Sequence, residues 1–249
     1  MDPGDGGQLK GVPMMTIPSE TRGLADHGWL KSRHTFSFAE YYDPKRMGFG
    51  ALRVINDDYV AAAKGFGTHP HRDMEIISIP LSGTLKHRDS EGNAAKITKG
   101  EVQIMSAGTG IFHSEHNASD EEEVRFLQIW VMPKKLNIRP RYDQKTYELK
   151  DNELTLIVSP TGSGTAVGIN QDAYFSLGRV TEGKSVSYDV KESGNGVFVF
   201  VLSGTVIVNG QELRVRDGVG ISETNNLSIN ASENAEVLLM EVPMMGMHG

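Results

Sequence analysis

The 249-residue sequence contains no cysteine. A disulfide framework, a cysteine-ligated zinc site and a thiol nucleophile are therefore all excluded, and any metal must be held by histidine, carboxylate or backbone oxygen ligands. The sequence also lacks an apolar run of about 18 residues and a leader that is first basic and then apolar. We therefore expect a cytoplasmic protein that does not interact with membranes.

The sequence has fewer basic than acidic residues. Lysine and arginine together number 25 against 32 aspartate and glutamate residues, which gives a formal net charge of −7. Proteins that bind nucleic acid independently of its sequence need clustered Lys and Arg to displace counterions from phosphates. We therefore expect no direct nucleic-acid partner. The acidic run at residues 120–123 is typical of a solvated loop.

Helical periodicity is also missing, because no segment keeps a 3.6-residue apolar period over three turns. Short segments bounded by Gly, Asn, Asp or Pro are instead rich in β-branched and aromatic residues. The clearest are residues 51–56, 74–80, 102–105 and 126–132. The sequence therefore predicts an all-β fold, either a sandwich or a barrel.

An internal repeat divides the chain. Residues 79–85 resemble residues 201–206 around Gly83 and Gly204, and a second glycine follows in each half, Gly100 in the first and Gly218 in the second. A repeat of about 120 residues is too long for a solenoid and indicates two tandem β-domains. We expect a disordered leader over 1–15, a metal-binding domain over 16–135 and a second domain without metal over 136–249, joined near the basic, proline-flanked segment 133–141.

Two histidine clusters lie in the first half. His69 and His71 are one residue apart, so on a strand their side chains share a face with Cβ atoms about 6–7 Å apart. Alone, such a pair is as typical of two surface histidines as of a metal site. His113 and Glu115 also share a parity, so two strands can offer two ligands each to one ion.

The second half differs at the matching positions. Residues 117–247 contain no histidine, and aligning the repeat places residues near Val190, Glu192, Ala231 and Glu233 opposite the four candidate ligands. Metal chemistry is therefore expected only in the first half.

These motifs resemble a known family. The pattern Gly65-x3-His69-x-His71-x3-Glu75, with Gly83, Gly100 and His113 downstream, is similar to the two cupin motifs. The strings Arg22 to Leu30, Arg33 to Phe38, Met47 to Gly50 and Arg53 to Asp58 resemble the pirin family, over roughly residues 17–243. The resemblance implies a bicupin, in which two jelly-roll-like β-barrels stand in tandem.

The resemblance also implies a site and an activity. It assigns His69, His71, His113 and Glu115 to one divalent transition metal, iron first, with zinc, manganese, nickel, cobalt or copper as alternatives. Glu75 is the alternative carboxylate, since it lies on the same strand face as His71. Bacterial relatives are quercetinases, which open the heterocyclic ring of flavonols with O₂ and release CO, so flavonol and O₂ are the expected partners, with Glu115 as base.

Other functions remain open at this point. Members of the family also act as non-enzymatic metal-binding regulators of protein partners, and other cupins catalyse other metal-dependent reactions. We expect a monomer, because a bicupin already pairs two barrels in one chain. The other histidines are expected to lie outside the metal shell, with His27 and His34 structural, His87 solvent-facing or behind the ligands, and His116 directed away. Candidates for an apolar pocket are Phe49, Phe66, Ile104, Met105, Ile111, Phe112 and residues 126–130.

Overall fold

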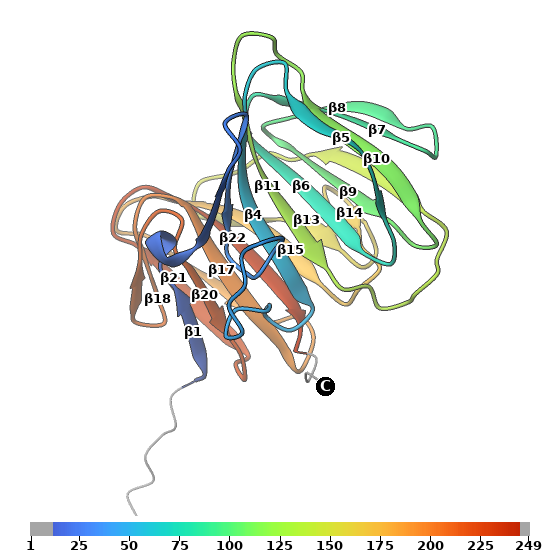
Figure 1. Cartoon of the computed structure of the whole chain (residues 1–249). Helices are drawn as coiled ribbons and strands as arrows, with labels where there is room; N and C mark the ends of the chain where they lie inside the picture. Colours follow the sequence, from blue (N-terminus) through green and yellow to red (C-terminus); the bar gives the residue numbers. More distant parts are fainter. Residues whose placement is uncertain (1–11, 245–249) are drawn as a thin grey trace, which may run out of the picture.

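The computed structural model describes residues 12–244 (Figure 1). Across that range the chain forms 22 β-strands and one 3₁₀ turn, η1 (Ser19–Thr21). Within it, no helix has the length and apolar character needed to cross a membrane. The all-β expectation is confirmed.

Two sheets make up the first half of the molecule. A seven-stranded sheet has the order β12 (Arg141–Thr146), β9 (Glu101–Ser106), β6 (Glu75–Ser82), β11 (Val124–Val131), β4 (Leu52–Val60), β3 (Leu30–His34), β2 (Gly23–Asp26). A four-stranded sheet has the order β5 (Gly65–His71), β10 (Ile111–Asn117), β7 (Thr84–Asp89), β8 (Ala94–Thr98).

The second half repeats this plan. Its seven-stranded sheet has the order β1 (Met14–Ile17), β20 (Gly218–Ile221), β17 (Asn195–Ser203), β22 (Ala235–Pro243), β15 (Tyr174–Val180), β13 (Glu153–Ser159), β14 (Val167–Gly168). Its four-stranded sheet has the order β16 (Ser185–Asp189), β21 (Asn226–Ala231), β18 (Val206–Val208), β19 (Gln211–Leu213). The sheets do not close, so each half is an open jelly-roll-like sandwich, consistent with the expected bicupin fold.

Strand order confirms the internal repeat. The run β9-β6-β11-β4 recurs as β20-β17-β22-β15, and β5-β10-β7-β8 recurs as β16-β21-β18-β19. Gly83 and Gly204 are equivalent, with φ values of 72° and 71°, whereas Gly100 lies in a turn at φ 91° and Gly218 lies within β20. Only glycine adopts this left-handed conformation without strain, which explains why both turns retain it.

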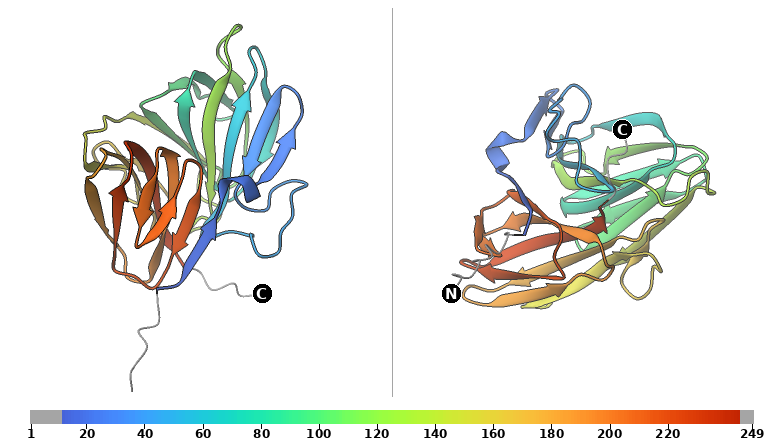
Figure 2. Two further views of the ribbon diagram at one scale, coloured as in Figure 1. Left: turned by 90° about the vertical axis from the view of Figure 1, so that its left-hand side faces the viewer. Right: turned by 90° about the horizontal axis from the view of Figure 1, so that it is seen from below.

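The two halves exchange their first strands. β1 pairs with β20 of the second half, and β12, which lies inside the expected 136–249 domain, pairs with β9 of the first (Figure 2). Residues 1–11 of the expected leader lie outside the described residues. Met14 and Met15 of that leader form part of β1, because their backbone groups complete the edge of β20. The domain limits at 135 and 136 stay a prediction.

The apolar core is distributed unequally. One cluster joins the two large sheets, with Ile77 and Leu127 from the first half and Phe198 and Leu238 from the second. A second cluster fills the sandwich of the second half with seventeen buried apolar residues. Within the described residues, the interior of the first sandwich holds two small apolar clusters, of five and four buried residues. Polar side chains occupy the remaining interior of the first sandwich.

Candidate metal centre

Three histidines meet where β5 pairs with β10. The antiparallel register places His113 directly opposite His69, and His71 follows on the same face of β5. The Nε2 atom of His113 lies 2.9 Å from Nε2 of His69 and 3.1 Å from Nε2 of His71. His69, His71 and His113, which the alternation of strand side chains placed on one side of their strands, therefore bring their three Nε2 atoms together.

The surroundings favour neutral rings with free Nε2 lone pairs. Nδ1 of His69 donates a 2.7 Å hydrogen bond to the carbonyl oxygen of Gly67, which leaves the Nε2 lone pair directed at the other two rings. Burial, followed by the neighbouring histidines, lowers the pKa of His71 to about 4 and that of His113 to about 2. Both rings are therefore neutral at pH 7, the form that binds metals.

The spacing of the nitrogens fits a transition metal. Metal–imidazole bonds of about 2.0–2.1 Å at right angles separate the two nitrogens by about 3.0 Å. The observed 2.9 and 3.1 Å match this value. Three imidazole nitrogens so close together cannot satisfy one another by hydrogen bonds, since a neutral ring has one donor and one acceptor. A shared cation satisfies all three.

Glu115 lies beside His113, deeper in the sandwich. Its carboxylate accepts hydrogen bonds from Ser78 Oγ at 3.2 Å and from Gln128 Nε2 at 2.6 Å, and it is 1 % exposed. Burial raises the pKa of Glu115 to about 7, against the effect of these two donors. Ligand atoms of Glu115, His113 and His87 lie within 4.8 Å of one another, whereas His69 and His71 belong to the other such group.

Glu75 is held elsewhere. Its Oε2 atom accepts hydrogen bonds from Ser106 Oγ at 2.8 Å and from the backbone N–H of Asn170 at 3.1 Å. Burial raises the pKa of Glu75, and these donors and Arg141 oppose that shift. Glu75 therefore ties the first half to the second, and among the described residues it joins neither group of candidate metal ligands.

His87 takes the second of its two expected places, behind the ligands. It is 1 % exposed, because β7 pairs with β10 and turns this side chain inward, where its ring lies 5.4 Å from that of His113. One ring nitrogen lies 2.9 Å from Asp89 Oδ2 and the other 3.1 Å from Gln103 Nε2, so both are occupied. His116 is exposed, in agreement with its opposite parity.

A cavity of about 270 Å³ opens beside the three histidines. It is lined by Ala25, His27, Leu30, Ser32, His34, Phe38, Ala39, Asn56, Asp58, Phe66, His69, His71, Gln128 and Trp130. Two of the expected aromatic residues, Phe66 and Trp130, are confirmed in this lining. The other three are not. Phe49 is buried against Phe198 in the core between the halves, Phe126 is buried in a core cluster of the first half, and Phe112 is 54 % exposed.

The sequence reasoning missed a polar row on one wall of this cavity. Nδ1 of His34 lies 2.8 Å from Asn56 Oδ1, and Asp58 follows Asn56 on the same face of β4. Burial raises the pKa of Asp58 to about 7, and its Oδ1 atom is buried without a hydrogen-bond partner. Polar residues at alternate positions of a strand otherwise rich in apolar residues were the available signal, since a buried strand rarely carries them without a use.

Residues 136–244 of the second half contain no counterpart of this site. Asn117 pairs with Leu85 and Ala231 pairs with Val206, so the equivalents of His113 and Glu115 are Leu227 and Ile229, both buried. This corrects the match near Ala231 and Glu233 that the sequence offset indicated. The loops of the second half differ in length, which the offset ignored.

Two families of known proteins match the chain. Residues 18–131 match the family model described as Pirin, and residues 156–242 match the one described as Quercetinase C-terminal cupin domain. A curated protein named quercetin 2,3-dioxygenase from Escherichia coli (strain K12) is 45 % identical over 223 residues, which cover 89 % of this chain and 95 % of that protein. A pirin-like protein from Caulobacter vibrioides is 40 % identical, covering 90 % and 97 %.

Solved structures agree. A bacterial pirin from Escherichia coli, solved in complex with nickel(II), superposes with a TM-score of 0.89 at 42 % identity, covering 94 % of this chain and all of that one. A quercetin 2,3-dioxygenase from Acinetobacter baumannii has a TM-score of 0.73 at 23 % identity, covering 92 % and 86 %. The second likeness bears on the fold alone.

Proposed function

The chain belongs to the pirin family, and from that membership we propose that it is a metal-dependent dioxygenase that opens the heterocyclic ring of flavonols such as quercetin with O₂ and releases CO. Relatives named quercetin 2,3-dioxygenase support the reaction class. The observation that carries the proposal is the convergence of three imidazole Nε2 atoms, from His69, His71 and His113, beside a largely apolar cavity.

The proposed ligands are His69, His71, His113 and Glu115. Three ring nitrogens suit a borderline cation, and the carboxylate of Glu115 beside His113 is the available oxygen donor. Iron is the first candidate, with zinc, manganese, nickel, cobalt and copper as alternatives, and elemental analysis of protein purified without chelator decides among them. When bound, the metal supplies positive charge that stabilises a deprotonated substrate hydroxyl.

Glu115 is proposed as the base. Burial raises the pKa of Glu115 to about 7 in the metal-free protein, and a ligand carboxylate that turns one oxygen away from the ion can accept the proton of a phenolic hydroxyl. Gln128 donates to Oε2 and Ser78 to Oε1, and these bonds hold the carboxylate in place while it takes up the proton. Glu115 then returns this proton to the ring-opened product.

The cavity orients a flat polyphenol. Phe38, Phe66 and Trp130 offer apolar faces that exclude water from the aromatic rings. The polar row of His34, Asn56 and Asp58 lines the same space, with His34 against Phe38, and can bind ring hydroxyls. A site with several buried polar groups discriminates in favour of substrates that pair with all of them.

Two further features complete the proposal. The protein acts in the cytoplasm as a monomer, with its chemistry confined to residues 16–135 and with 136–249 as a metal-free support.

Aerobic incubation with quercetin tests the function. Metal-replete protein is expected to remove the near-visible absorbance of quercetin and to release CO, whereas His71→Ala is not. Equal rates for the metal-replete protein and the variant would refute the reaction. Loss of quercetin without CO would identify a different oxidation.

A further inference from the structure

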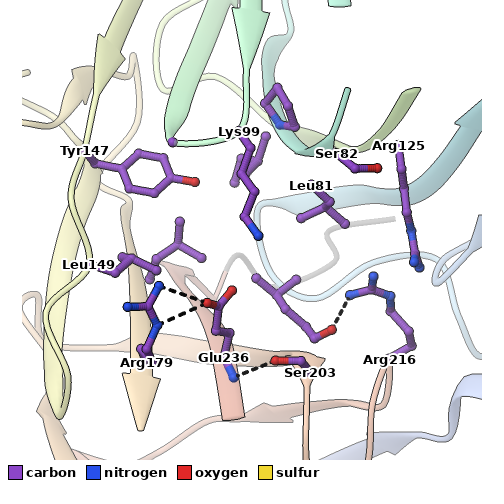
Figure 3. A pocket seen from close by; sticks show the side chains of 15 residues that line it. Leu81, Ser82, Lys99, Arg125, Tyr147, Leu149, Arg179, Ser203, Arg216 and Glu236 are labelled. Atoms are coloured by element: carbon purple, nitrogen blue, oxygen red, sulfur yellow. Dashed lines mark hydrogen bonds and ion pairs between the residues drawn. The ribbon is translucent and has the colours of Figure 1, made fainter. Parts of the chain in front are cut away.

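A second hollow lies between the two halves, away from the histidines. Its volume is about 470 Å³, and Figure 3 shows the side chains around it. The end of β6 and Lys99 contribute from the first half, whereas β15, β17 and β22 contribute from the second. None of its lining residues belongs to the cavity beside the metal ligands.

One part of this hollow is apolar. Side chains from both halves supply this surface, namely Ile79, Leu81, Tyr147, Leu149, Leu177 and Leu202. Tyr147 and Leu149 follow β12, so the strand exchange itself brings them to this position. An aromatic or aliphatic body of a few rings or carbons would lose water against this surface.

The remaining part is cationic. Lys99, Arg125, Arg179 and Arg216 line it, and Glu236 is the only acidic side chain in the lining. Arg179 is neutralised, because it pairs with Glu236 at 3.3 Å and with Asp151 at 3.5 Å. Figure 3 shows Arg179 and Glu236 on one side of the hollow and Arg125 and Arg216 on the other.

The arginines on the other side share one carboxylate. Asp57, 1 % exposed, pairs with Arg125 and Arg216 at 3.1 Å each and with Arg22 at 3.5 Å. Burial lowers the pKa of Arg216 and of Arg22, against the attraction of Asp57. Nε of Arg216 and Nη1 of Arg22 are buried without a hydrogen bond.

Lys99 adds to this excess. It is exposed and has no ion-pair partner within residues 12–244, and Figure 3 shows its side chain extending into the hollow. Lys99, Arg125 and Arg216 thus line the hollow, and among the described residues Asp57 is the one carboxylate that pairs with any of them, in a protein whose net charge is −7. Grouping like charges in a partly buried hollow is costly unless an anion compensates them.

We propose that this hollow binds a small organic anion, with an apolar body against Leu81, Leu149 and Leu202 and a carboxylate or phosphate group between Lys99 and Arg216. Nε of Arg216 faces Asp57 and its Nη1 donates to the Leu202 carbonyl, so Arg216 would offer Nη2, and Lys99 its ammonium, to either head group. Because residues from both halves hold the ligand, its binding also joins the two sandwiches. The site is independent of the proposed oxygenase reaction, so either can fail alone.

Calorimetric titration of the protein as purified, in phosphate-free buffer of fixed ionic strength, tests the proposal. The probes are phenyl phosphate and benzoate, with inorganic phosphate and uncharged phenol for comparison. Phenyl phosphate or benzoate is expected to bind about tenfold more tightly than both inorganic phosphate and phenol. An aromatic anion contacts both the apolar and the cationic part of the hollow, whereas each comparison compound contacts one part. The anion that binds more tightly identifies the head group. Equal affinity for phenol would overturn the proposal.

Variants locate the site. Lys99→Gln and Arg216→Gln are each expected to weaken that anion about tenfold. Lys99 is exposed, so its replacement leaves folding intact even if Arg216→Gln does not fold. Arg214→Gln, at an exposed arginine paired with Glu212, is the matched control and should bind as the wild type does. Binding that survives Lys99→Gln but disappears in His71→Ala would place the anion at the metal ligands and overturn the proposal.

Discussion

The side-chain amide of Gln128 donates a 2.6 Å hydrogen bond to Oε2 of Glu115, and its oxygen accepts one of 3.2 Å from Trp130 Nε1. A carboxylate of raised pKa is thereby connected to the aromatic wall of the cavity through one amide. Gln128 favours the ionised form of Glu115, because an N–H donor stabilises the carboxylate.

Gln128→Leu should therefore raise the pKa of Glu115 further. We expect the acidic limb of the pH–rate profile for quercetin to move to higher pH, and kcat at pH 7 to fall about tenfold. The profile separates this effect from a loss of stability, which would lower the rate at every pH. Gln211→Leu, at an exposed position of β19, is the control and should leave the profile unchanged.

Metal retention distinguishes the two carboxylates. His113→Ala and Glu115→Ala should each retain less than about a tenth of the wild-type metal, because each removes a proposed ligand. Glu75→Ala should keep it, since Glu75 is bound to Ser106 and Asn170. Elemental analysis measures the metal, and His116→Ala is the histidine control. Retention in Glu115→Ala together with loss in Glu75→Ala would reverse the assignment.

His87 is expected to support the metal site without binding the ion. Both of its ring nitrogens are occupied, by Asp89 and by Gln103. His87→Gln should therefore keep metal as purified, yet bind it about 10–100-fold more weakly in a competition with a chelator. Complete loss of metal as purified would make His87 a ligand.

Metal-free protein should show the raised pKa of Glu115 in its stability. The folded pKa of about 7 lies above that of an unfolded glutamate, so the folded state binds more protons between pH 4.5 and 7. The contribution of Glu115 is therefore fully present below pH 4.5 and is lost as pH rises through 7. The histidines act oppositely, because their lowered pKa values make the folded state lose stability as pH falls below 6.5.

Comparison with Glu115→Gln isolates this contribution. In the metal-free state the variant should gain up to about 3 kcal/mol relative to the wild type between pH 4.5 and pH 8. Urea unfolding at the two pH values measures the difference. If the difference in unfolding free energy between Glu115→Gln and the wild type does not change with pH, Glu115 has an ordinary pKa in the folded protein.

Local sequence signals predicted much of the fold and part of the site. Alternation placed His69 and His71 on one face, and the glycines at 83 and 204 revealed the repeat, because both signals depend on neighbouring residues only. The pairing of strands far apart in the sequence could not be predicted from such local signals. The inward turn of His87 and the convergence of Arg22, Arg125 and Arg216 on Asp57 depend on which strands lie side by side.

The edge strands test how far the halves depend on each other. Ile17 of β1 is 1 % exposed and belongs to the apolar cluster that contains residues of both halves. Ile17→Ala should cost about 3 kcal/mol and lower the thermal midpoint. Calorimetry is expected to show one transition in both proteins, whereas two separate transitions in the wild type would show independent halves.

The exchange of β1 and β12 has a consequence for truncation. Each repeat donates its opening strand to the other, so neither sandwich can be cut out of the chain with its sheet complete. A gene fragment encoding only the half with the candidate metal ligands would express a protein with an unpaired edge at β9, a template for aggregation. The reciprocal fragment, without β1, would leave the edge of β20 unpaired. Neither half can therefore be removed without exposing a sheet edge of the other.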